Sequence, residues 1–90
     1  MAGERILVVE DERIVLMDIK NTLKRLGYEV PDTATEGADA VAKAGKLRPE
    51  LVLMDVRLDG GMDGVEAARH VQRLYDIPVI FLTAYSNENT

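Results

Sequence analysis

Three short apolar runs, separated by stretches of helical period, constrain the fold of this 90-residue chain more than any other feature. The runs read ILVV at 6–9, LVLMDV at 51–56 and PVIFLTA at 78–84. They are nearly continuous rather than alternating, which is typical of strands buried on both faces of a parallel sheet. The alternation of strand and helix therefore predicts an α/β domain with an open parallel sheet and helices on both of its faces.

The spacing of apolar residues and of helix-ending residues sets the expected boundaries. We expect strands at 5–10, 28–31, 51–56 and 77–83, and helices at 12–26, 35–47 and 64–75. The apolar face expected for the first helix comprises Val15, Ile19, Leu23 and Leu26, and Gly27 ends this helix. Pro31 cannot donate to a strand ladder, so the weak second strand belongs at a sheet edge. The expected strand order is 2-1-3-4, and such sheets bind ligands at the carboxyl ends of the strands where the winding reverses.

Composition excludes several classes of protein. The apolar fraction of 47% is that of a globular chain, and the length suits one domain. A formal net charge of −5 disfavours binding to a nucleic-acid backbone. The chain has no cysteine, which excludes disulfides and thiolate metal sites. No apolar run reaches the roughly 18 residues of a membrane span, and no secretory signal is present, so we expect a cytoplasmic protein without a membrane partner.

Acidic residues follow directly on two of the apolar runs. Glu10 and Asp11 end the first predicted strand, and Asp55 lies near the end of the third. Neighbouring carboxylates oppose ionisation and folding unless a cation lies between them, and a donor set made only of oxygen atoms indicates Mg²⁺ or Mn²⁺. Asp55 is also a competent nucleophile towards phosphorus. Thr83 closes the fourth strand, where its hydroxyl could donate to a phosphoryl oxygen on Asp55.

Taken together and in this order, VVEDE, LVLMDV followed by MDG, and PVIFLTA resemble the receiver domain of two-component response regulators, which has a flavodoxin-like fold. The resemblance extends from about residue 5 to about residue 85. It implies that Asp55 is the phosphoacceptor and that Glu10, Asp11 and Asp55 hold the Mg²⁺ ion. Further implied roles are a metal-binding backbone carbonyl at Arg57, a switch hydroxyl at Thr83 and a backbone N–H to the phosphoryl group at Ala84.

The resemblance also implies a function in signal transduction. A histidine kinase or phosphotransfer protein would donate the phosphoryl group from a phosphohistidine, and the domain would then switch its partner interactions. The domain would be no enzyme beyond assisting its own phosphorylation and dephosphorylation.

Two departures from the family pattern lie in the loop after Asp55 and at the end of the chain. The loop RLDGGMDG at 57–64 lacks the usual Met-Pro, and we expect Gly60 and Gly61 to adopt positive φ there. No residue corresponds to the lysine that ends the family's fifth strand, so residues 1–90 are interpreted as a C-terminally incomplete receiver domain. In such a chain the strand at 77–83 becomes an edge, and we expect self-association through it.

Simpler structural roles compete for several of these residues. Asp11 could cap the first helix, and Thr35 the second; Glu12 could be a first-turn acid. Asp63 and Glu66 have the spacing of a capping box. His70 has no partner at metal spacing and is interpreted as a surface residue.

Three functional alternatives stay open. They are a receiver-like fragment that only binds partners, a metal-dependent phosphohydrolase, and a nucleotide or flavin module. The last would need a phosphate-binding loop after the first strand, where this chain has acids.

Overall fold

The computed structural model of the chain describes residues 3–82 and has the predicted alternation of strands and helices. The elements are β1 (Ile6–Val9), α1 (Arg13–Arg25), β2 (Thr33–Ala34), α2 (Gly37–Leu47), β3 (Leu51–Asp55), α3 (Gly64–Tyr75) and β4 (Val79–Leu82). All strand pairs are parallel, and the order is β2-β1-β3-β4. The predicted fold class and strand order are therefore confirmed. Thr83 and Ala84 lie outside the described residues.

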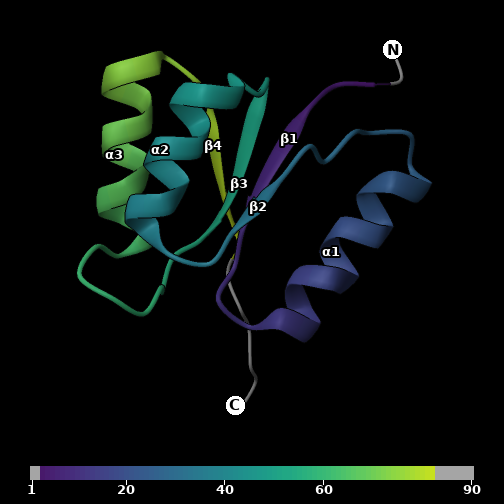
Figure 1. The fold of residues 1–90 in the computed structure, drawn as a ribbon, viewed down its shortest axis with the longest axis horizontal. Helices are drawn as coiled ribbons and strands as arrows, with labels where there is room; N and C mark the ends of the chain where they lie inside the picture. The colour runs from purple at the N-terminus through teal and green to yellow at the C-terminus, as the bar shows by residue number, and fades with distance from the viewer. Residues whose placement is uncertain (1–2, 83–90) are drawn as a thin grey trace.

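Within residues 3–82, helices cover both faces of the sheet, as Figure 1 shows: α1 lies on one face, and α2 and α3 lie together on the other. The side chains of β1 alternate between the two layers. Leu7 and Val9 are buried in the cluster under α2 and α3, and Ile6 and Val8 are buried in the smaller cluster under α1. Because both faces of β1 are covered, an uninterrupted apolar run is the sequence that fits this strand.

Helix α1 packs through a face that differs from the expected one. Ile19 and Leu23 pack against the sheet as predicted, but the fully buried residue is Leu16. Val15 is 38% exposed and Leu26 is 68% exposed, so these two assignments were wrong. Four consecutive apolar residues at 14–17 allow the helix to present more than one apolar face, and packing against Ile6 and Val8 selects the face with Leu16.

The second strand was predicted at 28–31 and is formed instead by Thr33–Ala34, which pairs with Val8 and Val9. Only one isolated bridge, between Glu29 and Arg5, marks the earlier segment. Pro31 stands between the bridge and the strand, and its nitrogen has no hydrogen to donate to the ladder. The expectation that this segment lies at a sheet edge is confirmed, because β2 is the first strand of the order.

The backbone conformations of three glycines test the predictions about the end of α1 and the turn before α3. Gly27 has φ 98° and follows Leu26, the C-cap of α1, as expected for a residue that ends a helix, and Gly60 has φ 103°. Gly61 does not have a positive φ, so one glycine is sufficient for the turn.

The residues that precede the three helices differ in how they cap them. The Asp63 carboxylate accepts the Glu66 N–H at 2.9 Å, which confirms that Asp63 caps α3. The residues before α1 and α2 are Glu12 and Glu36, without a side-chain capping bond, so the roles suggested for Asp11 and Thr35 as caps, and for Glu12 as a first-turn acid, were wrong.

Within the part of the chain that the structure describes, no helix has both the length and the apolar character needed to cross a membrane.

Candidate metal and phosphoryl site

The carboxyl ends of β1 and β3 bring together the three carboxylates that the sequence analysis singled out. Glu10 follows the last residue of β1, and Asp55 is the last residue of β3. The two strands are direct neighbours and pair in register from Ile6 with Leu51 to Val9 with Met54. One oxygen atom from each of Glu10, Asp11 and Asp55 lies within 4.8 Å of the others. We call this group the acidic cluster.

Two members of the acidic cluster are buried, which is expensive for a carboxylate. Glu10 is 6% exposed and Asp55 is 8% exposed, whereas Asp11 is half-buried. Each buried carboxylate accepts one backbone N–H two residues further on: Glu12 donates to Glu10 Oε2, and Arg57 donates to Asp55 Oδ1, both at 3.1 Å. Among residues 3–82, no lysine or arginine forms an ion pair with the cluster. The local charge is therefore strongly negative.

The electrostatic consequence appears at Glu10. Burial raises the pKa of Glu10 to about 7, and the negative charges of Asp55 and Asp11 act in the same direction. The hydrogen bond from the Glu12 N–H opposes this shift because it favours the ionised form. Near neutral pH the ionised carboxylates of the acidic cluster therefore repel one another, and a bound cation would relieve this repulsion.

The donor atoms fit a hard divalent cation. Mg²⁺ is bound through one or two carboxylates with water and phosphate oxygens as further ligands, and the cluster offers carboxylate oxygens at the open end of a sheet. The cluster thus supports the predicted kind of metal, while the individual ligand roles of Glu10, Asp11, Asp55 and the Arg57 carbonyl stay predictions.

One feature next to the cluster was missed in the sequence. Gly64 begins α3, and a Cβ atom at this position would overlap the carbonyl oxygen of Asp55 and lie 2.8 Å from that of Val56. The Gly64 N–H also donates to the Val56 carbonyl at 3.0 Å. The start of α3 is therefore held directly against the backbone of Asp55. The Asp-Gly pair at 63–64 was the available signal, but it was interpreted only as part of the family pattern and as the beginning of a helix.

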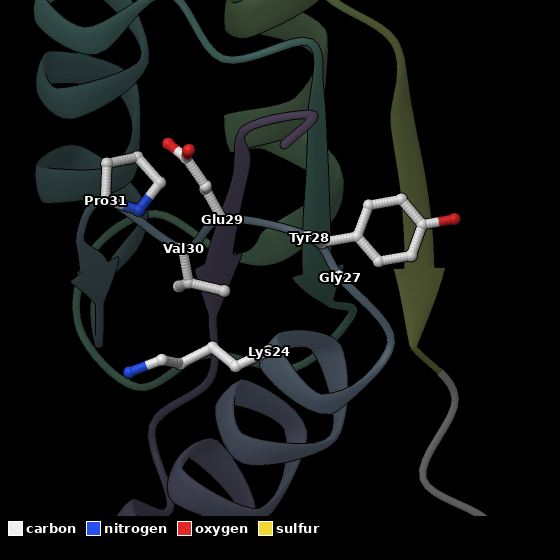
Figure 2. A pocket seen from close by; sticks show the side chains of 6 residues that line it. All are labelled: Lys24, Gly27, Tyr28, Glu29, Val30 and Pro31. Atoms are coloured by element: carbon white, nitrogen blue, oxygen red, sulfur yellow. The ribbon is translucent and has the colours of Figure 1, made fainter. Parts of the chain in front are cut away.

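A separate hollow of about 370 Å³ lies at the other end of the strands (Figure 2). It is lined by Lys24, Gly27, Tyr28, Glu29, Val30 and Pro31. Glu29 pairs with Arg5, which precedes β1, whereas the acidic cluster follows β1. The hollow therefore does not belong to the candidate site.

Comparison with known proteins agrees with this geometry. The sequence profile of the response regulator receiver domain matches residues 6–90. The transcriptional regulatory protein PdtaR of Mycobacterium tuberculosis is 36% identical over 85 residues, and the match covers 94% of this chain and 41% of PdtaR. The phyllosphere-induced regulator PhyR of Methylorubrum extorquens is 38% identical over 86 residues, with 94% of this chain and 32% of PhyR covered. The chain thus spans less than half the length of these two relatives.

Solved structures give the same result at the level of the fold. The signal receiver domain of a modulated diguanylate cyclase from Desulfovibrio desulfuricans G20 superposes with a TM-score of 0.88 at 36% identity. That match covers 93% of this chain and 67% of the solved chain. The response regulator domain of CheB from Thermotoga maritima superposes with a TM-score of 0.86 at 27% identity, and 97% of this chain and 65% of that chain are covered.

Proposed function

Since the chain belongs to the family of response regulator receiver domains, which are phosphoryl-accepting signalling domains, we propose that Asp55 is its phosphoacceptor. The observation that supports Asp55 most directly is its place in the acidic cluster. Its carboxylate is 8% exposed, ends the strand next to β1, and lies against Glu10 and Asp11. A buried carboxylate with two acidic neighbours is costly for folding, which is reasonable only where a cation and a reaction need it.

The chemistry proposed for Asp55 is a nucleophilic displacement at phosphorus. One oxygen of Asp55 accepts the Arg57 N–H, and no other hydrogen bond from residues 3–82 engages this carboxylate, so its second oxygen is available for attack. A P–O bond to Asp55 forms while the P–N bond of a donor phosphohistidine breaks, and the electron pair of that bond stays on the imidazole nitrogen. Positioning and charge neutralisation are the main needs of such a transfer.

A divalent cation, Mg²⁺ or Mn²⁺, would supply the charge neutralisation. We propose Glu10, Asp11 and Asp55 as its carboxylate ligands and the Arg57 backbone carbonyl as a further ligand, supported by the 4.8 Å clustering of the carboxylate oxygens. The role of this chain's residues is to hold the negative oxygens at a fixed place before the donor arrives.

The partners follow from the same proposal. The phosphoryl donor would be a histidine kinase or a phosphotransfer protein, and the chain would catalyse nothing beyond its own phosphorylation and dephosphorylation. A cytoplasmic location is the expectation that goes with this function. Thr83 as the switch hydroxyl and Ala84 as a backbone donor stay predictions, because they lie outside the described residues.

The proposed function is tested by intact mass spectrometry after incubation with acetyl phosphate and Mg²⁺. We expect the wild-type chain to gain one phosphoryl group, which hydroxylamine removes because it cleaves acyl phosphates. Asp55→Asn keeps the size of the side chain and removes the nucleophile, so it should gain none. The matched control is Asp59→Asn, which changes an exposed carboxylate in the same loop and should behave like the wild type.

The result that contradicts the proposal is equally specific. Equal modification of Asp55→Asn and of the wild type, or a phosphoryl group localised to His70 by peptide mass spectrometry, would show that Asp55 is not the acceptor. Binding of the unmodified chain to a partner without any Mg²⁺-dependent modification would instead favour a receiver-like interaction domain.

A further inference from the structure

The loop between β3 and α3, residues 56–63, starts directly after Asp55, and the residue that follows the loop, Gly64, packs against the Asp55 backbone. The loop leaves Asp55 at the end of β3, and the hydrogen bond from Gly64 to the Val56 carbonyl closes it. The close approach of Gly64 to the Asp55 carbonyl fixes the same point. Arg57, whose N–H orients the Asp55 carboxylate, lies within this loop. The path of the loop therefore determines how the Asp55 site is arranged.

Two apolar side chains anchor the loop to the domain. Leu58 is 8% exposed and belongs to the core cluster under α2 and α3. Met62 is half-buried and packs against the same cluster. The residues between them, 59–61, are exposed. The conformation of the loop thus depends on the packing of Leu58 and Met62 rather than on its tip.

The first residue of α2 makes a close approach to one of these anchors. Gly37 is buried, and a Cβ atom on it would lie 2.5 Å from the Met62 carbonyl oxygen and 3.1 Å from Cβ and Cγ of Met62. Gly37 does not have a positive φ, so its backbone conformation suits any residue. Space alone requires glycine here: any side chain would push the Met62 backbone, and with it the loop, away from α2.

We propose that the contact between Gly37 and Met62 positions the Asp55 site. Because Gly37 has no side chain, Met62 can pack against the start of α2. This contact holds the loop in the position where the Arg57 N–H donates to the Asp55 carboxylate and where the Arg57 carbonyl can bind the metal. Gly37 touches no reacting atom and acts only through the loop. The inference rests on the proposed function for its link to phosphorylation, but its effect on metal binding is separable.

The test measures Mg²⁺ affinity by isothermal titration calorimetry, with urea unfolding of the same samples. Loss of groups that orient metal ligands typically weakens metal binding 10- to 100-fold, so we expect Gly37→Ala to weaken Mg²⁺ binding by about ten-fold. The matched control is Gly45→Ala near the other end of α2, where an added Cβ would meet the ring of Tyr75 instead. This control should lose stability and keep its Mg²⁺ affinity within about two-fold.

A substitution on the other side of the contact separates positioning from general damage. Met62→Ala keeps Gly37 and removes the side chain that anchors the loop to the core, so it should weaken Mg²⁺ binding as well. This variant also tests the proposal if Gly37→Ala does not fold.

The outcomes distinguish this inference from the proposed function. Wild-type Mg²⁺ affinity in Gly37→Ala, or an equal loss in Gly45→Ala, would overturn the positioning role while phosphorylation of Asp55 could still be observed. Failure of the wild type to be phosphorylated by acetyl phosphate would overturn the proposed function, and the Mg²⁺ titrations would still decide the role of Gly37.

Discussion

Glu10 shows at the scale of one residue how the site opposes the fold. Its carboxylate is 6% exposed and lies beside two other acids, and burial raises its pKa to about 7 from an ordinary value of 4.5. The folded chain without metal therefore holds a proton on Glu10 between these two pH values, whereas the unfolded chain does not. Stability from this group is fully present below pH 4.5 and is lost as the pH rises through 7.

This sign leads to a prediction for Glu10→Gln. Without divalent ions at pH 8, the variant should be more stable than the wild type by roughly 3–3.5 kcal/mol, at about 1.4 kcal/mol for each pH unit between the two pKa values. The advantage should shrink as the pH falls from 8 to 5, because the wild-type carboxyl becomes neutral. Urea unfolding in EDTA at several pH values measures it. Glu12→Gln, at an exposed neighbour, should show no such trend.

Saturating Mg²⁺ should make the wild type more stable than Glu10→Gln. The proposed ligand role of Glu10 predicts that the ion stabilises the wild type more than Glu10→Gln, because binding to the folded state adds to its stability. A variant that stays less stable than the wild type in EDTA at pH 8 would contradict the assigned cost of the Glu10 charge.

At the scale of elements, the start of α3 is fixed by a glycine that meets the backbone of β3. Gly64→Ala should lower the free energy of unfolding by several kcal/mol, because backbone atoms of Asp55 and Val56 stand where the new Cβ would lie and cannot rotate away. Gly61→Ala is the matched control: an added Cβ meets nothing within 4 Å and φ is not positive, so the change should be neutral or slightly stabilising. Urea unfolding compares the two variants, and equal stabilities would contradict the claim that the close approach of Gly64 to Asp55 and Val56 fixes the start of α3.

The same elements show what the sequence could and could not predict. Strand order and the acidic cluster were predictable, because parallel strands end at one edge and Glu10, Asp11 and Asp55 stand at two such ends. The position of β2 was not predictable, since a strand of two residues, Thr33 and Ala34, is too short to leave a sequence pattern. Pro31 interrupts the segment where the strand was expected. The close approaches of Gly37 and Gly64 were also not predictable, because they depend on where distant backbones cross.

At the scale of the whole molecule, the sheet and α1 leave apolar side chains exposed. In the described part of the chain β4 pairs only with β3, and Ile80 and Phe81 on it are 53% and 40% exposed. On α1, Ile14 is 86% exposed and Met17 is 50% exposed. Of these two elements, only β4 adds backbone N–H and C=O groups that have no partner strand among residues 3–82, which makes a sheet edge a template for pairing.

We therefore predict that the 90-residue chain self-associates through β4. Burying an Ile or Phe side chain fully is worth roughly 1.5–3 kcal/mol, and here about half of that is available for each, in both copies of a pair. Sedimentation velocity over a dilution series should show a concentration-dependent dimer or larger species. Ile80→Lys places a charge on the edge and should shift the chain to monomer, whereas Ile14→Lys, a more exposed isoleucine on α1, should leave the association unchanged. A monomer at every concentration would contradict the edge argument, and loss of association in Ile14→Lys alone would move the interface to α1.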